Sequence, residues 1–379
     1  MNILYAKKFR FPDDSANMIQ GLHMVEAFER CGLSTSAFFS FDRELTDPIL
    51  FLQEKYGINP YYFKGKNFAS QKMRGAHYLM WLLHNIFTLE KPIIYTREGT
   101  EARRLGLLRH LHFPTLPLFH EVHKYNIDFT SNSTEEKTKI KSLARLFTQV
   151  SGLIFIDEAL QFQAQKYLHL TVPSCVAPSG VNLSCFEGRP LAPHSPDIVI
   201  GYFGKIVAQK GINLLLESFR LLPACYHLRL IGKVEEKERN HLLSLAGEAA
   251  SRIHFIGHVD HAHLADAMKG VHISVIPSIS KTQFLSPLKL AESLAMGLPI
   301  VCTPLPHIER LLEEGKHALF SPDVSPQGLA ASIIKLGSSP EKLTLMSHEN
   351  RSYAHAFSWE ARARRIIRFM EETQESRNS

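Results

Sequence analysis

Residues 284–301 read FLSPLKLAESLAMGLPIV and predict a helix whose two ends are marked in the sequence. Ser286 suits the N-cap and Pro287 suits the first helical position, while Gly297 and Pro299 end the helix. Free backbone N–H groups and the helix dipole at such an N-terminus attract anions. We therefore expect this helix to begin at an anion-binding site.

Glu292 lies one turn further into the same helix, on the edge that it shares with Lys289 and opposite an apolar arc. A carboxylate in that position can accept two hydroxyl groups of a ribose whose phosphates lie at the helix N-terminus. A capped core helix with a Lys289–Glu292 pair three residues apart explains the same spacing. The residues alone leave both interpretations open.

A second informative stretch, GYFGKIVAQKGIN at residues 201–213, overlaps a predicted strand at 198–203. Gly204 permits a close approach of the backbone to a ligand. Lys205 and Lys210 flank the loop and can together neutralise a diphosphate, although lysines beside a surface turn are common. The stretch contains neither the GxxxxGK[ST] pattern nor the GxGxxG pattern.

The rest of the chain alternates short β-branched runs with helical patterns, which is typical of parallel α/β sheets. The predicted strands of the first half are residues 2–6, 34–41, 92–96, 116–120, 153–157 and 175–178. Those of the second half are residues 198–203, 227–231, 253–257, 273–277, 299–303 and 318–321. The predicted helices are residues 16–30, 211–222, 236–249, 261–269, 287–296, 307–314 and 327–336.

These elements form two series, so we expect two domains, residues 1–181 and 198–357, each with its own sheet. Residues 182–197 are rich in glycine, proline and serine and are predicted to be the linker. A length of 379 residues agrees with two domains. Open parallel sheets bind ligands at the carboxyl ends of their strands, so a cleft between the domains is the expected site.

Composition excludes several classes of protein. The net charge of +6 is too small and too dispersed for a dedicated nucleic-acid binder, and a hydrophobic fraction of 45% excludes wholesale disorder. The five cysteines form no CxxC pair, which argues against a zinc site and favours reduced thiols. The N-terminal apolar run is too short for a signal peptide, and no run approaches the roughly 20 residues of a membrane span. We expect a cytoplasmic protein.

Two stretches of the first domain mix basic with aromatic residues, namely residues 61–68 and 71–83. Such a mixture suits an anionic membrane surface and a lipid-linked acceptor. A loop and a buried helix explain it as well, so the sequence does not separate the two.

Taken together, the motifs resemble the donor half of glycosyltransferase family 4, which has the GT-B fold. The resemblance rests on the order of its pieces: G-x-F-G-K-x-x-x-x-K-G from Gly201, Ile276–Ser278, and S-P-L-K-L-x-E-x-x-A-M-G-x-P-I-V from Ser286. Further pieces are Phe11-Pro12 leading to Gln20, His120–His123, Ser179–Asn182 and Phe357–Trp359. Together they cover most of the chain.

The resemblance implies an α/β protein of two Rossmann-like domains that face each other across a cleft. The first domain would bind the acceptor and the second the donor, and a C-terminal helix at about 358–374 would cross back to the first. The implied reaction is a retaining, metal-independent transfer of a hexose from a UDP-, GDP- or ADP-sugar to a glycan, a lipid-linked or another hydroxyl acceptor. Cell-surface polysaccharide biosynthesis is the implied process, with no permanent cofactor and peripheral contact with the inner membrane face as an option.

The resemblance also implies roles for residues of the donor half. Lys205 and Lys210 would hold the diphosphate and stabilise the charge that develops on it during transfer. Ser286, Pro287 and Leu288 would supply backbone N–H groups to the phosphates, and Glu292 would bind the ribose. Gly204 and Val259 would lie against the nucleotide, Val259 beside the base.

In the acceptor half, His123 resembles the family's histidine near the donor sugar, where a neutral imidazole would accept a hydroxyl group. Asn17, Gln20, Arg97 and Glu121 are weaker candidates for contact with acceptor or sugar. Of Glu121 and His123, we expect only one to face the site, and for Arg97 a surface pair with Glu98 explains the pattern as well.

The sequence departs from the family at two places. Phe284 stands where the first glutamate of the family's EX7E motif is expected, and Ser15-Ala16-Asn17 replaces a Gly-Gly pair. Backbone groups in place of the glutamate, an altered donor or weak activity would each account for Phe284. A sugar phosphorylase, a nucleotide-sugar epimerase and a non-catalytic nucleotide-sugar-binding protein therefore stay as alternatives. A periplasmic two-lobed binding protein would need a signal peptide.

Overall fold

The computed structural model describes residues 1–13, 15–42, 46–63, 67–69, 76–186, 196–279 and 287–378. The chain divides into two compact units. Unit 1 comprises Met1–Gly180 together with Trp359–Ser379, and unit 2 comprises Val181–Ser358. Each unit is described separately below.

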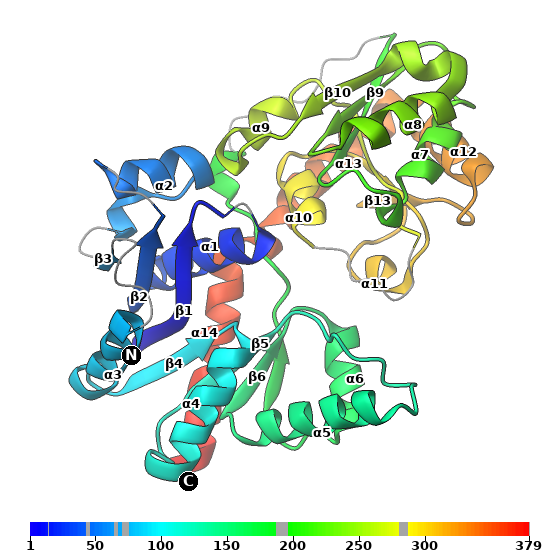
Figure 1. The fold of residues 1–379 in the computed structure, drawn as a ribbon. Coiled ribbons are helices and arrows are strands. Elements are labelled where there is room, and N and C mark those ends of the chain that lie inside the picture. Colours follow the sequence, from blue (N-terminus) through cyan, green and yellow to red (C-terminus); the bar gives the residue numbers. More distant parts are fainter. Residues whose placement is uncertain are drawn as a thin grey trace. The chain divides into compact units, whose positions relative to one another are not determined.

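Unit 1 contains a parallel sheet of seven strands in the order β3-β2-β1-β4-β5-β6-β7 (Figure 1). Its central part has the 3-2-1-4-5-6 order of a doubly wound sheet, with the reversal between β1 and β4. The strands are β1 (Asn2–Phe11), β2 (Ser34–Phe41), β3 (Asn67–Ala69), β4 (Pro92–Thr96), β5 (Leu118–Val122), β6 (Gly152–Phe155) and β7 (Ser174–Val176).

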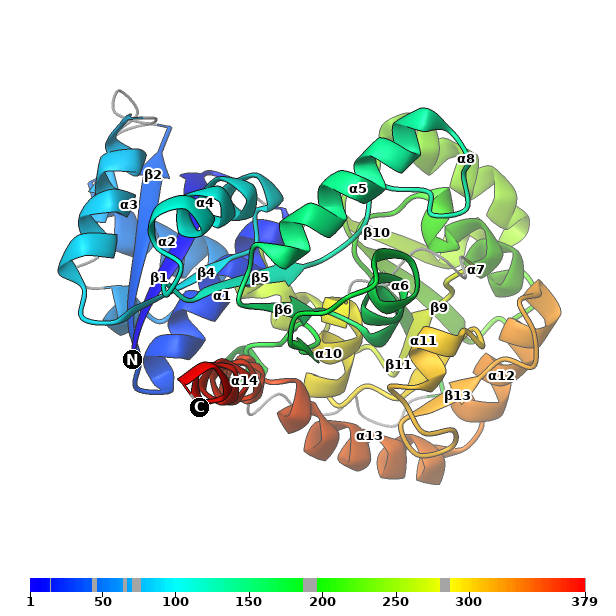
Figure 2. The ribbon, with the colours of Figure 1, turned by 90° about the horizontal axis from the view of Figure 1, so that it is seen from below.

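Helices cover both faces of this sheet. Figure 2 shows α4 and α5 on one side of the strands β4 to β6 and α14 on the other, where α14 packs against α1. The helices are α1 (Ala16–Arg30), α2 (Pro48–Tyr56), α3 (Ala76–Thr88), α4 (Gly99–His112), α5 (Thr134–Thr148), α6 (Glu158–Leu168) and α14 (Trp359–Asn378), with a 3-10 turn at Pro60–Phe63.

The chain thus returns to unit 1 after unit 2 is complete. Phe369 of α14 packs edge-to-face on Phe119 of β5, with ring centroids 5.8 Å apart. Gly152 of β6 makes room for this pair, because a Cβ there would lie 2.9 Å from both rings. The last helix is therefore part of the core of unit 1.

Strand β1 is longer than the sequence predicts. The prediction ended at Ala6 because Lys7 and Lys8 interrupt the apolar run, but the strand continues to Phe11. A register shift between Tyr5 and Lys8 lets the strand bulge, and the Lys7 side chain stays buried because it pairs with Glu98.

Unit 2 contains a parallel sheet of six strands in the order β10-β9-β8-β11-β12-β13, which is again the 3-2-1-4-5-6 order. The reversal lies between β8 and β11. The strands are β8 (Ile198–Phe203), β9 (Tyr226–Ile231), β10 (Ile253–Gly257), β11 (Ile273–Ile276), β12 (Ile300–Cys302) and β13 (Ala318–Phe320).

The helices of unit 2 cover the two faces of its sheet, over two apolar clusters. They are α7 (Ile212–Phe219), α8 (Glu236–Ala246), α9 (Leu264–Ala267), α10 (Pro287–Ala295), α11 (Pro306–Glu309), α12 (Pro326–Gly337) and α13 (Pro340–Ala354). Short 3-10 turns occur at Leu183–Cys185, Ala208–Lys210, Gly247–Arg252, His261–His263 and His355–Phe357.

The start of the predicted linker packs onto unit 2. Phe186 is buried in an apolar cluster of that unit, and the Val181 amide donates to the Phe357 carbonyl. The prediction missed this because an isolated phenylalanine among turn residues carries no periodic pattern. Residues 187–195, the rest of the linker that the sequence predicts, lie outside the described residues.

The structure assigns no helix within the described residues that has both the length and the apolarity to cross a membrane.

Gly211, at the start of α7, offers a test of the packing of unit 2. Its φ is +79°, and a Cβ would lie 1.6 Å from the Pro277 carbonyl oxygen. Gly211→Ala should lower the free energy of unfolding by about 3 kcal/mol or more, since left-handed backbone strain adds to overpacking. Urea unfolding followed by circular dichroism measures the change.

Gly315 is the matched control, since its φ is +78° and nothing lies within 4 Å of its would-be Cβ. Gly315→Ala should lower the free energy of unfolding by only about 1 kcal/mol, which is the cost of placing an alanine in the left-handed backbone region. Equal losses in the two variants would show that the contact with Pro277 is not tight.

Candidate functional sites

The switch point of the sheet in unit 2 gathers the two stretches that the sequence singled out. The loop after β8 carries Gly204 and Lys205, and α10 begins with Pro287 after β11. Gly204 has a φ of +117°, and its would-be Cβ would lie 2.1 Å from Lys289 Cε. A glycine is therefore required at position 204 by the backbone conformation and by the lysine that crosses over it.

Lys289 is a site residue that the sequence analysis did not select. Its Nζ donates to the Tyr202 hydroxyl at 2.9 Å and lies 4.4 Å from the centre of that ring. Burial and, after it, the charge of Lys210 lower the pKa of Lys289 to about 7, while Glu292 opposes the shift. A small cavity of about 20 Å³ lies between Lys289, Lys210 and Ser278.

The pattern around Lys289 predicted a Lys289–Glu292 pair as one option, but Lys289 bonds across the unit to Tyr202. The Glu292 carboxylate is buried and lies 3.3 Å from the His261 Nε2 atom. In the sequence, Gly204 was the one indication that Lys289 lies at this site. A residue without a side chain leaves room for a long neighbouring side chain such as that of a lysine.

The other predicted residues of unit 2 divide by exposure. Lys205 is exposed and its carbonyl accepts a hydrogen bond from the Tyr202 hydroxyl, whereas Lys210 is half-buried. Val259 follows β10 and packs against an apolar cluster of the unit.

At the start of α10, Pro287 has no backbone N–H, so it cannot donate to a phosphate as predicted. Leu288 keeps its N–H while its side chain is buried. Ser286 and Phe284 lie outside the described residues.

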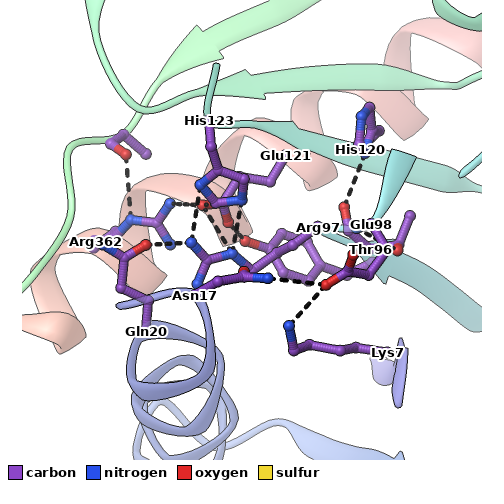
Figure 3. Close-up of polar contacts among 12 residues, drawn as sticks. Lys7, Asn17, Gln20, Thr96, Arg97, Glu98, His120, Glu121, His123 and Arg362 are labelled. Carbon is purple, nitrogen blue, oxygen red and sulfur yellow. Dashed lines mark hydrogen bonds and ion pairs between the residues drawn. The ribbon is translucent and has the colours of Figure 1, made fainter. Parts of the chain in front are cut away.

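In unit 1, a buried polar network lies at the carboxyl ends of β4 and β5, beside the strand-order reversal (Figure 3). Arg97, directly after β4, is its centre. The Arg97 Nε donates to His123 Nε2 at 2.9 Å, and Nη2 lies 2.9 Å from His123 Nδ1 and donates to the Gln20 amide oxygen. A surface pair of Arg97 with Glu98, one option left open by the sequence, is wrong, because the Arg97 side chain is 1% exposed.

Glu121 is the acidic residue that links the two arginines of this network, Arg97 and Arg362. Its carboxylate lies 2.8 Å from Arg362 Nη2 and 3.4 Å from Arg97 Nε, and it accepts from the Tyr95 hydroxyl. Burial raises the pKa of the Glu121 carboxyl, and Arg362 opposes that rise. Arg362 belongs to α14, and its Nε also donates to the Ala177 and Pro178 carbonyls.

The expectation that only one of Glu121 and His123 faces the site is wrong. The Glu121 Oε1 and His123 Nε2 atoms lie 3.6 Å apart. Side chains two residues apart in a strand point to the same face, and His123 directly follows β5, which extends two residues beyond its predicted end.

His123 is held as a neutral imidazole. Burial, followed by the positive charges of Arg97 and Arg362, holds its pKa well below the usual value. Its side chain nevertheless keeps 24% of its surface exposed. Because Nε2 accepts from Arg97, the neutral ring has one N–H with which it can donate a hydrogen bond at neutral pH.

Asn17 joins the same region through Glu98. Its Nδ2 donates to Glu98 Oε1 at 3.0 Å, and Lys7 Nζ donates to the same oxygen at 2.7 Å. The structure thus brings together His123 and all four of the weaker candidates. Lys7, Tyr95 and Arg362 were missed, because no local pattern links residues so far apart in the chain.

A pocket of about 790 Å³ opens above this network. Arg97, Glu121 and His123 form its floor, and α5 supplies one wall with Thr138 and Ser142. Its mixture of hydroxyl, charged and apolar groups is typical of a site that orients a polar ligand.

Among the described residues, no three His, Cys, Asp or Glu side chains come together in a way that would hold a metal ion.

Comparisons with known proteins place this geometry in context. Residues 197–339 match the family model described as Glycosyl transferases group 1. The phosphatidyl-myo-inositol mannosyltransferase of Mycobacterium leprae is 27% identical over 165 residues, which cover 42% of this chain and 43% of that protein. A putative teichuronic acid biosynthesis glycosyltransferase of Bacillus subtilis is 26% identical over 208 residues, covering 52% and 50%. The chain spans about half the length of these curated relatives.

Solved structures match over nearly the whole chain. Sucrose-phosphate synthase from Thermosynechococcus elongatus superposes with a TM-score of 0.71 at 17% identity, covering 99% of both chains. The Anabaena protein HepE, solved in complex with UDP, superposes with a TM-score of 0.69 at 16% identity, covering 98% of this chain and 100% of that one. At these identities, the likeness establishes the fold alone.

The depressed pKa of Lys289 predicts a pH dependence of stability. The unfolded chain keeps this proton up to about pH 10.5, whereas the folded chain releases it near pH 7. The unfolding free energy of the wild type should therefore rise relative to that of Lys289→Met between pH 7 and pH 10. Urea unfolding at several pH values measures the difference.

Lys335 is exposed on α12 and provides the control, since Lys335→Met should leave the pH profile unchanged. Parallel profiles for the wild type and Lys289→Met would contradict the burial of the Lys289 ammonium.

Removal of the buried Glu121 carboxylate should destabilise unit 1. Glu121→Gln leaves Arg97 and Arg362 without their shared counter-charge, so we expect a loss of about 3 kcal/mol or more in the free energy of unfolding. Glu135→Gln breaks a pair with Lys139 in which both side chains are exposed, at 77% and 41%, and should cost less than about 1 kcal/mol. Comparable losses in the two variants would show that the buried network does not depend on Glu121.

Proposed function

We propose that sugar transfer from a nucleotide-sugar is the function of this chain, whose second unit belongs to the glycosyl transferases group 1 and which has the GT-B fold. The observation that carries the proposal is the convergence, at the switch point of unit 2, of the Gly204 loop, the start of α10 and the buried Glu292. In doubly wound sheets, nucleotides bind at this place.

The donor phosphates would bind between the two lysine-bearing stretches. Lys205 and Lys210 lie on the loop after β8, and the Leu288 amide lies in the first turn of α10. Cleavage of the anomeric C–O bond leaves negative charge on the distal phosphate of the leaving nucleoside diphosphate. Cations and helix-end N–H groups already in place stabilise that charge without reorganisation.

Glu292 would accept the ribose hydroxyl groups. It lies in the second turn of α10, and His261 holds its carboxylate in place at 3.3 Å. Gly204, in the loop after β8, would lie against the nucleotide, and Val259 would lie near the base. The structures of HepE in complex with UDP and with UDP-glucose support a nucleotide-sugar as the co-substrate, while the nucleotide that this chain uses is part of the proposal.

Unit 1 would bind the acceptor in the pocket above His123. The neutral imidazole accepts from Arg97 at Nε2 and can donate from its other ring nitrogen to an acceptor hydroxyl oxygen, while Gln20 holds the Arg97 guanidinium. Asn17 and Glu98 offer further partners for hydroxyl groups at the same pocket. A glycan or lipid-linked acceptor fits this mixture, and His123 is the proposed catalytic residue of unit 1.

We further propose that the transfer retains the anomeric configuration and needs no metal, as the resemblance of the donor motif implies. Cell-surface polysaccharide biosynthesis in the cytoplasm is the proposed setting, with the acceptor presented at the membrane face. Exposed Leu79, Met80 and Phe87 on α3 would serve such a contact. Residues 64–66 and 71–75, which the sequence included in this surface, lie outside the described residues.

The donor site has a direct test. Calorimetric titration with UDP, GDP and ADP in EDTA should detect binding of one nucleotide without a metal, and Glu292→Gln should weaken it at least tenfold, or about 1.4 kcal/mol. The reason is the loss of one charged acceptor for the ribose hydroxyl groups. Binding of none of the three nucleotides would refute the donor site.

Glu341→Gln is the matched control, since Glu341 is exposed on α13 and distant from the switch point in sequence. It should leave nucleotide affinity within twofold of the wild type. A nucleotide-binding protein that never cleaves a donor would support the non-catalytic alternative, and turnover with phosphate but no nucleotide would identify a phosphorylase.

A further inference from the structure

The buried network of unit 1 carries more positive than negative charge. Arg97 and Arg362 share a single carboxylate, that of Glu121, and all three side chains are at most 3% exposed. His123 is neutral and supplies no compensation. A protonated Glu121 would leave the excess larger still. A buried unpaired charge is costly, so a counter-ion would stabilise this arrangement.

The nearest other charges do not remove the excess. Lys7 and Glu98 neutralise each other at 2.7 Å. Lys139, on the α5 wall of the pocket, pairs with Glu135 and Glu136 at 2.6 and 2.7 Å. Of the described residues that line the pocket, the remaining charged ones are Arg103 and Lys124, and both are exposed and positive.

The two arginines of the network also have donor groups that make no hydrogen bond within the described residues. Nη1 of Arg97 and Nη1 of Arg362 are buried and make no hydrogen bond within the described residues. The Arg97 guanidinium lies beneath the His123 ring, whose partly exposed side chain faces the pocket. Guanidinium groups match the planar, two-oxygen geometry of carboxylates and phosphates.

We propose that the floor of this pocket, at His123 and Arg97, is a binding subsite for an oxyanion, a phosphate or carboxylate group carried by the substrate. Asn17, Thr138 and Ser142 border the same pocket and suit the hydroxyl groups of a sugar that bears such an anion. The inference deepens the proposed function, on which it rests for the identity of the anion's carrier. It makes the acceptor an acidic sugar or a sugar phosphate.

The test uses the full chain at low chloride, with inorganic phosphate, glucuronate and neutral glucose as probes in calorimetric titrations. We expect phosphate or glucuronate to bind and glucose to bind at least tenfold more weakly than the better anion. Arg97→Gln should weaken anion binding at least tenfold. Arg97→Lys keeps the charge without the planar fork, so it should weaken binding less and carries the test if Arg97→Gln does not fold.

Two control variants show whether the anion binds elsewhere in the chain. Arg104→Gln removes an exposed arginine of α4, the helix that follows Arg97 in the chain, and should leave anion affinity within twofold. Lys210→Gln alters the proposed donor phosphate site of unit 2, so any loss of affinity that it causes measures the anion bound there. Loss of anion binding in Lys210→Gln but not in the Arg97 variants would place the anion in unit 2 and overturn the proposal, as would the absence of anion binding in the wild type.

Comparing UDP affinity with anion affinity tests the source of the oxyanion separately from the proposed function. Unchanged UDP affinity in Arg97→Gln, with weakened phosphate or glucuronate binding, assigns the anion to the acceptor, whereas a parallel loss of UDP affinity assigns it to the donor and overturns the acidic acceptor. If anion binding depends on Arg97 but the chain binds no nucleotide, the oxyanion subsite is supported and the sugar-transfer function is refuted.

Discussion

The contact between Glu121 and two guanidinium groups is the interaction on which unit 1 depends. One carboxylate, buried at the end of β5, lies between Arg97 from the neighbouring strand end and Arg362 from the last helix. Because charges in a protein interior are stable only when they are paired, these three side chains fix one another's positions. The same contact ties α14, which follows unit 2 in the chain, to the sheet that the first residues form.

The position of His123 follows from this arrangement. Arg97 lies within hydrogen-bonding distance of both nitrogen atoms of the ring, and Gln20 of α1 holds the same guanidinium. The surrounding positive charge keeps the imidazole neutral. A group that would otherwise titrate near neutral pH thus becomes a fixed hydrogen-bonding partner at the floor of the pocket.

Unit 2 has a buried lysine, in place of the two arginines of unit 1, at the strand-order reversal of its sheet. There, the backbone of Gly204 adopts a positive φ and leaves space for the Lys289 side chain, which Tyr202 anchors. The result is a lysine whose pKa lies near neutrality, between the proposed phosphate-binding loop and a helix start. Both units thus place buried basic side chains at the reversal of strand order, where the proposed anionic ligands of each unit would bind.

Hydrophobic periodicity predicted every strand except β3, because parallel α/β sheets repeat a local pattern. Of the helices, it predicted only α1 in unit 1 and all but α13 in unit 2. Residues 16–30 form the predicted helix α1, and all six strands of unit 2 begin within a residue of their predicted starts. The motifs around Gly204 and Glu292 were also legible, since glycines, caps and charges at helix ends act through local geometry. The partners of Lys7, Glu121, Lys289 and Arg362 were not, because each lies far away in sequence. Burial of a charge is decided by whichever residue the fold brings opposite it, and that information exists only once the sheets and α14 have assembled.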